Sequence, residues 1–245
     1  MIAFHLNRYD RLASTSDEIR RLAETGAPNG TVVLARQQTQ GRGRVGRAWS
    51  SPAGNLHLSI LLRPELPARR IAELGFLAGL AAAEAVDRAF ADGSVHATLK
   101  WPNDVRIGGA KIAGILLESE LLAEGIAWAA VGIGINVAHH PDDTPYPATS
   151  LHQAGAASAT PDGCAAALLD RFGRWWEVWS RRGFEPVRAA WLARADQLGQ
   201  VIGVRVGDRH LSGRFDGIGA DGALLLTTDA GQQAITAGEV GAAPI

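Results

Sequence analysis

The chain is poor in cysteine and in net charge, and each shortage excludes a class of protein. Cys164 is the only cysteine among 245 residues, which excludes an internal disulfide and a cysteine-based metal site. The net charge of −1 creates no global field that would attract nucleic acid or an anionic membrane. Any basic binding site must therefore be local.

Long apolar runs are also missing. Residues 1–14 lack the apolar core of a signal peptide. The longest uncharged apolar run, residues 125–138, is too short to span a bilayer. We therefore expect a cytoplasmic protein with no membrane partner, whose 47% hydrophobic residues are enough for a globular core.

Lysine is the rarest charged residue. All but two of the 24 Lys and Arg residues are arginine, and the two lysines, Lys100 and Lys111, lie eleven residues apart. A coding bias toward arginine explains the scarcity but not why the two lysines are neighbours. Lysine carries a compact, movable ammonium that the planar guanidinium of arginine does not imitate. Both lysines are therefore candidate functional residues.

Helical and strand patterns alternate irregularly along the chain. A helix begins near Ser14 with a capping box, Ser14 with Asp17 or Thr15 with Glu18, and stops at Gly26. Further helices are predicted over residues 67–91, 161–181 and 185–195. Strands are predicted over residues 30–38, 55–63, 95–121 (with a hairpin) and 126–137. Because most strands follow one another directly, we predict an α+β fold with a mixed sheet packed with helices.

The pattern changes after Leu198, where short apparent strands alternate with Gly-Asp turns and no helical period remains. This alternation of short strands and turns predicts a small β-barrel. We therefore expect a catalytic domain over residues 1–195 and a small C-terminal β domain over residues 196–245.

The stretch "GRGRVGRAWS", residues 41–50, contains the spacing G-x-G-x-x-G of dinucleotide-binding loops. That fingerprint requires a helix that opens on the third glycine. Here the chain continues through Ser-Ser-Pro into another strand, so the dinucleotide interpretation fails. The stretch can still form an anion-binding site of another kind.

The same stretch carries Arg42, Arg44 and Arg47 on a glycine-rich loop. Guanidinium groups this close repel one another unless an anion lies among them. Such a loop can close over a phosphate or an acyl phosphate. A solvated surface loop is the alternative. Trp49, which follows the loop, could stack on a base or belong to the core.

The second motif, "KWPNDV", lies beside both lysines. Asn103 and Asp104 offer oxygens that suit magnesium or a ribose hydroxyl. A Gly-Gly turn at residues 108–109 predicts a hairpin in which Asp104 faces Ala113, so that Asp104 and Lys111 project from one face. A cross-strand ion pair without function is the alternative.

Taken in order, "STSDE", "GRGRVGRAW", "KWPNDV", "KIAG" and "GIGIN" resemble the biotin protein ligase family over about residues 10–140. The last fifty residues resemble its small SH3-like C-terminal domain. The resemblance implies a class II synthetase-like catalytic domain that uses ATP and Mg²⁺. Biotin would be activated to biotinyl-5′-adenylate and transferred to a lysine of a biotin carboxyl carrier protein.

The resemblance also implies roles for individual residues. The catalytic residues would be Lys111, Arg44 and Arg42. The biotin side would comprise Ser14, Thr15, Ser16, Gln38, Gly41, Arg42, Gly43, Arg44, Lys111 and Gly114. The ATP side would comprise Arg44, Arg47, Trp49, Lys100, Asn103, Asp104, Lys111 and Asn136, with Asp104 also binding Mg²⁺.

Two residues depart from the family's usual pattern: Ser16 stands where Asn is common, and Val45 replaces a frequent loop arginine. Only about thirteen residues precede Ser14, too few for the winged helix-turn-helix of bifunctional members. We therefore expect a monofunctional ligase, monomeric or homodimeric, that does not bind nucleic acid. A lipoate ligase or octanoyl transferase of the same core fold is the alternative.

Overall fold

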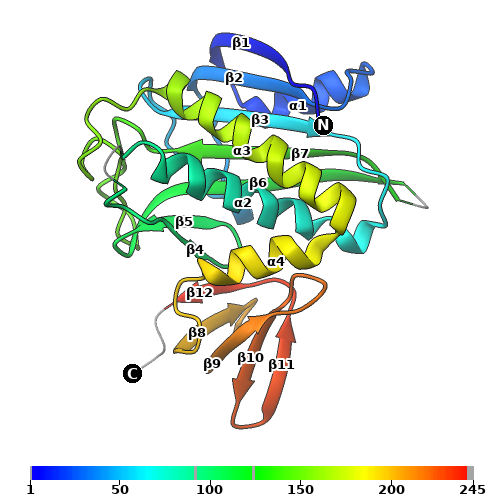
Figure 1. Ribbon diagram of the computed structural model, residues 1–245, viewed down its shortest axis with the longest axis vertical. Coiled ribbons are helices and arrows are strands. Elements are labelled where there is room, and N and C mark those ends of the chain that lie inside the picture. Colours follow the sequence, from blue (N-terminus) through cyan, green and yellow to red (C-terminus); the bar gives the residue numbers. More distant parts are fainter. Residues whose placement is uncertain (1, 91–92, 123–124, 242–245) are drawn as a thin grey trace.

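The computed structural model describes residues 2–90, 93–122 and 125–241, which form two sheets and four α-helices (Figure 1). The larger sheet contains β1 (His5–Leu12), β2 (Thr31–Gln38), β3 (Leu56–Leu62), β4 (Thr98–Lys100), β5 (Asp104–Ile107), β6 (Ala110–Leu122) and β7 (Gly125–Ile135). The smaller sheet contains β8 (Val201–Val206), β9 (Arg209–Ile218), β10 (Leu224–Thr228), β11 (Gly231–Ile235) and β12 (Glu239–Gly241). The helices are α1 (Thr15–Glu24), α2 (Ala72–Asp87), α3 (Pro161–Arg182) and α4 (Phe184–Ala193).

The larger sheet has the order β1-β2-β3-β7-β6-β5-β4, and only the pair β1–β2 is parallel. This mixed sheet confirms the predicted α+β class. β1 was not predicted, because its side chains are mostly exposed or half-buried and give no clean apolar alternation. The helix predicted over residues 67–91 is shorter, since a 3₁₀ turn (Ala68–Arg70) precedes α2.

The sheet is covered unequally on its two faces. α2 and α3 cover one face, where most of the buried apolar residues form a single core, whereas α1 alone packs on the other (Figure 1). β3 shows the division, because Leu58 and Ile60 belong to the larger core while Leu61 packs with Ile19 of α1. This alternation follows from the two-residue period of a strand. His57 and Ser59 therefore share the α1 face, which has room for a cavity.

The smaller sheet is antiparallel and is attached next to β4 and α4 (Figure 1). Trp101 Nε1 donates a hydrogen bond to the Gly222 carbonyl at 3.2 Å, and Arg188 donates to the Ile218 carbonyl at 2.7 Å. These bonds join the end of β9 and the turn that follows it to α4 and to the Trp101 turn of the larger sheet. Within the ranges described, no helix is both long and apolar enough to cross a membrane.

Candidate active site

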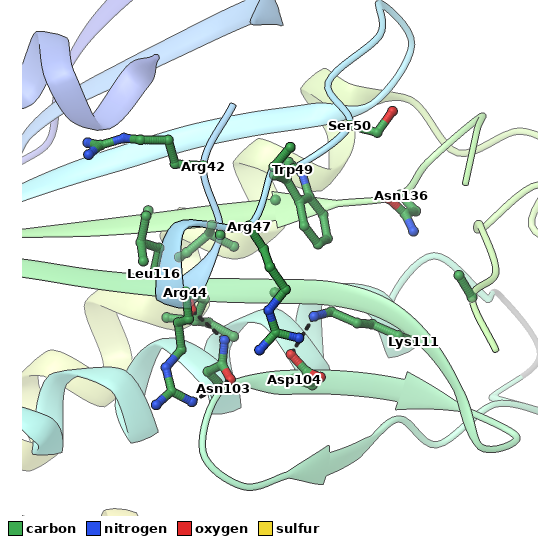
Figure 2. A pocket seen from close by; sticks show the side chains of 18 of the residues that line it. Arg42, Arg44, Arg47, Trp49, Ser50, Asn103, Asp104, Lys111, Leu116 and Asn136 are labelled. Carbon is green, nitrogen blue, oxygen red and sulfur yellow. Dashed lines mark hydrogen bonds and ion pairs between the residues drawn. The ribbon is translucent and has the colours of Figure 1, made fainter. Parts of the chain in front are cut away.

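A cavity of about 360 Å³ lies on the α1 face of the larger sheet (Figure 2). Its walls come from the start of α1, the end of β2, the Gly-Arg loop (residues 41–49), the β4–β5 turn, β6, β7, the segment 141–148 and β12. All sequence-predicted site residues except Gly41 line this cavity. Gly41 lies behind the wall, where a Cβ would fall 2.4 Å from both Ser51 Oγ and the Trp49 carbonyl oxygen.

One end of the cavity is polar but uncharged. A hydrogen bond of 2.7 Å joins Thr15 Oγ1 and Ser59 Oγ, and one of 3.2 Å joins Ser16 Oγ and Ser59 Oγ. Gln38 Oε1 accepts from the backbone N–H of Thr15 at 2.8 Å and from its hydroxyl at 3.1 Å. Ser14, also buried, completes the cluster. Such groups suit a neutral ligand that carries its own donors and acceptors.

The same hydrogen bonds correct the predicted capping box. Ser14 is the N-cap of α1 by its backbone, but its side chain makes no capping hydrogen bond. Thr15 directs its hydroxyl to Ser59 and Gln38. Glu18 accepts instead from Tyr9 and Arg21. The side chains of Ser14 and Thr15 therefore line the cavity and do not cap the helix.

Two facing glycines make the floor of the cavity. Gly114 of β6 and Gly134 of β7 are register partners, and the indole of Trp49 lies directly on them. A Cβ on Gly134 would fall 2.4 Å from Trp49 Nε1, and one on Gly114 would fall 3.1 Å from Trp49 Cζ3. Glycine is required where another group approaches a strand this closely. The buried Trp49 Nε1 has no hydrogen-bond partner among the described residues.

Lys111 lines the cavity from the start of β6. Its Nζ lies 2.6 Å from Asp104 Oδ1 and 5.4 Å from the ring centroid of Trp49 (Figure 2). The prediction that Asp104 and Lys111 share a face is confirmed. The predicted register is wrong by one residue, because a bulge in the β5–β6 pair sets Asp104 opposite Gly114 rather than Ala113.

Lys100 reaches the same cavity from the end of β4. Its Nζ lies 4.6 Å from the ring centroid of Tyr146, and no carboxylate of the described residues lies within 4.0 Å of it. Burial lowers the pKa of Lys100 below its usual value, and the negative charge of Asp104 offsets part of that effect. The two rare lysines therefore converge, one paired with a carboxylate and one not.

The three loop arginines have separate partners. Arg42 donates to Asp17 of α1 at 2.7 Å and to Glu118 of β6 at 3.0 Å, and Figure 2 shows it pointing away from Lys111. Arg47 pairs with Glu239 of β12. Arg44 donates to Asn103 Oδ1 at 3.2 Å, and burial lowers its pKa.

The partners of the three arginines differ in charge, and this difference sets Arg44 apart. Arg42 and Arg47 are both neutralised by carboxylates, whereas the partner of Arg44 is an uncharged amide. No carboxylate in the described part of the chain forms an ion pair with Arg44. The guanidinium of Arg44 and the ammonium of Lys100 are therefore cations of the cavity that remain available to an anion.

Several site residues were not identified from the sequence: His57, Tyr146 and Glu239, which line the cavity, and Ser59, which is hydrogen-bonded to the lining residue Thr15. Each is isolated in the sequence and becomes recognisable only by its position. The predicted Asn136 lines the cavity, but its Nδ2 donates to the Thr149 carbonyl at 3.0 Å and so supports the 141–148 wall.

A magnesium site made only of protein groups does not fit here. In the parts of the chain described, no three His, Cys, Asp or Glu side chains gather as metal ligands. Asp104 Oδ1 is nevertheless buried without a hydrogen bond of suitable geometry, although Lys111 Nζ lies 2.6 Å away. Because Mg²⁺ commonly takes one or two carboxylates together with substrate phosphates, Asp104 fits a shared site of that kind.

Comparison with known proteins agrees with this geometry. Residues 9–136 match the model of the biotin/lipoate A/B protein ligase family, and residues 198–240 match the biotin protein ligase C-terminal domain. The chain belongs to the biotin/lipoate A/B protein ligase family. The chain is therefore a ligase, and the two matched regions correspond to the larger and the smaller sheet.

Individual relatives resemble nearly the whole chain. The biotin--[acetyl-CoA-carboxylase] ligase of Paracoccus denitrificans is 41% identical over 235 residues, which is 94% of this chain and 97% of that protein. The bifunctional ligase/repressor BirA of Bacillus subtilis is 34% identical over 96% of this chain and 73% of its own length. Biotin protein ligase from Aquifex aeolicus, solved with biotin and ATP, superposes with a TM-score of 0.82 at 28% identity, covering 97% of each chain.

Proposed function

We propose that this ligase attaches biotin to a lysine of a biotin carboxyl carrier protein at the expense of ATP. One observation carries the proposal: a neutral hydroxyl and amide cluster and the cations Lys100, Lys111 and Arg44 line one cavity. The relatives from Paracoccus and Aquifex support the choice, since their names and ligands include biotin, a carboxylase and ATP.

The neutral cluster favours biotin over lipoate. The ureido ring of biotin has two N–H donors and a carbonyl acceptor, which match Ser14, Thr15, Ser16 and Gln38. The dithiolane ring of lipoate offers no N–H or C=O group, so these side chains would keep only the hydrogen bonds that they make with protein groups. A ligand that exchanges hydrogen bonds with the cluster is favoured over one that covers it without doing so, and the cluster therefore discriminates against lipoate.

The first half-reaction brings two anions together. An oxygen of the biotin carboxylate attacks the α-phosphorus of ATP, the bond to the bridging oxygen breaks, and pyrophosphate leaves. Lys111, Arg44 and Lys100 would offset the repulsion, because fixed cations stabilise charge that develops in the transition state. Lys111 would contact the carboxylate first and then the acyl-phosphate oxygens. Magnesium, when bound with ATP, would be held by Asp104 and would neutralise phosphate charge.

In the second half-reaction the amine of the carrier lysine attacks the acyl carbon of biotinyl-5′-adenylate, and AMP leaves with the electron pair of the acyl–oxygen bond. The mixed anhydride must be shielded from water until then. The Gly-Arg loop would supply that cover, fastened through Arg42 and Arg47 while Arg44 faces the phosphates.

The test is biotin-dependent exchange of labelled pyrophosphate into ATP by the purified protein with Mg²⁺, followed by transfer of labelled biotin to a carrier domain. We expect both reactions with biotin, and exchange with lipoate at least tenfold weaker. Absence of exchange with biotin, or equal exchange with lipoate, would contradict the assignment. A carrier domain whose acceptor lysine is replaced by arginine controls for non-specific labelling.

A further inference from the structure

Lys100 is held in the cavity by an aromatic ring. Its ammonium lies 4.6 Å from the centroid of Tyr146, and within the described ranges it forms no ion pair. The other ammonium, that of Lys111, is neutralised by Asp104 at 2.6 Å. A ligand therefore meets a neutralised ammonium at Lys111 and an unneutralised one at Lys100. The reason is that Lys111 has a carboxylate neighbour and Lys100 an aromatic one.

The segment that carries Tyr146 is tied to the site through the residues that follow the ring. The backbone N–H of Lys111 donates to the Pro147 carbonyl at 2.8 Å, and the N–H of Thr149 donates to the Lys111 carbonyl at 2.9 Å. Thr144 Oγ1 donates to the Tyr146 carbonyl at 2.6 Å. The first two bonds anchor the backbone that follows the ring to Lys111, and the third closes a turn around Tyr146, so the backbone of Tyr146 is held although its side chain is exposed.

An aromatic ring holds a cation differently from a carboxylate. The face of the ring attracts the ammonium through its quadrupole but carries no net charge. The ammonium therefore keeps its full positive charge and its N–H donors for another anion. A carboxylate in the same place would neutralise the charge and occupy those donors.

We propose that Tyr146 is the positioning residue of Lys100, and that its ring aims an uncompensated ammonium at the phosphates of ATP. The inference rests on the proposed function, because it requires a polyanionic substrate at this end of the cavity. Burial lowers the pKa of Lys100. The π face acts against that effect, because it favours the charged form.

The experiment compares Tyr146→Phe, which keeps the ring, with Tyr146→Leu and Tyr146→Gln, which remove it. We expect KM for ATP to rise about 3- to 30-fold in the Leu and Gln variants and to stay within twofold of the wild-type value in the Phe variant. KM for biotin and the melting temperature should not change. Leu6→Ala is a matched control, since Leu6 is as exposed as Tyr146, at 42%, and lies on β1 away from the cavity.

A double-mutant cycle separates positioning from a general structural role. The dissociation constant of ATP, measured by calorimetry on the biotin-bound protein, requires no turnover. Tyr146→Leu should weaken ATP binding when Lys100 is present and have no further effect in a Lys100→Ala background.

Equal effects in the two backgrounds, or a Phe variant as weak as the Leu variant, would overturn the role of Tyr146. A wild-type protein without biotin-dependent exchange would instead overturn the proposed function, so the two failures are distinguishable.

Discussion

Glu239 of β12 pairs with Arg47 of the Gly-Arg loop, so the smaller sheet contributes directly to the site of the larger one. Glu239 also pairs with Arg205 of the neighbouring strand β8. The loop is thereby fastened at two ends, by Arg42 to α1 and β6 and by Arg47 to β12. The C-terminal sheet therefore holds one end of the Gly-Arg loop and is not merely an attached module.

Replacing Glu239 by Gln should loosen this closure. We expect biotinyl-5′-adenylate to leave the protein a few-fold to about tenfold faster, a modest change because Arg47 is half exposed and its pair is screened by water. The measurement is the release rate of labelled adenylate from preformed complex. Arg205→Gln removes the other partner of Glu239 and is the control. Equal rates for the two variants would show that the pair with Arg47 has no role in retention.

The motifs with consecutive residues were predictable from the sequence. The Gly-Arg loop and "KWPND" each concentrate unusual residues in a few positions, so their chemistry is visible without a fold. The convergence of the two lysines followed from the hairpin. The one-residue error in that hairpin has a physical reason, because a bulge inserts one residue into a strand and changes the facing partner without a clear sequence signal.

The remaining site residues could not be predicted, because each depends on a long-range contact. Ser59 is one polar residue in a buried strand, and only the packing of α1 brings Thr15 to it. Glu239 lies about 190 residues from its loop partner Arg47. Tyr146 lies in a segment without periodicity, and its importance comes from the ammonium beside it.

Lys111→Ala should reduce adenylate synthesis by roughly 100-fold or more, the scale expected when a donor aimed at developing charge is removed. The variant also leaves the Asp104 carboxylate without its cation next to the phosphates. Single-turnover formation of adenylate at saturating substrates measures the effect. A Lys111→Ala variant within a few-fold of the wild type would contradict the role.

Gly134→Ala should disturb the site without unfolding the protein. The added Cβ would meet Trp49 Nε1 at 2.4 Å, so the indole must leave the floor of the cavity. We expect at least a tenfold loss of affinity for adenylate, measured by calorimetry. Gly75→Ala is the matched control, because a Cβ there meets no other group within 4 Å and alanine favours the helix. A Gly134→Ala variant that binds like the Gly75→Ala variant would show that the position of Trp49 is unimportant.

His57 should make the folded state sensitive to mild acid. The residue is 1% exposed, and its Nε2 donates to the Pro52 carbonyl at 3.1 Å. Since that carbonyl only accepts, Nδ1 carries no proton in the neutral ring, and it has no partner within the described ranges. Burial lowers the pKa of His57 below the ordinary 6.5, and the bond to Pro52 opposes this only partly.

The sign of the effect follows from this shift. On unfolding, the imidazole regains an ordinary pKa and takes up a proton between the folded value and about 6.5. The contribution of His57 to the free energy of unfolding is therefore complete above about pH 6.5 and falls as the pH is lowered through the folded pKa. The difference between urea-unfolding curves of wild type and His57→Gln, recorded from pH 5 to 8, isolates this contribution from that of the carboxylates. A pH-independent difference for His57→Gln would mean that His57 is not buried in its neutral form.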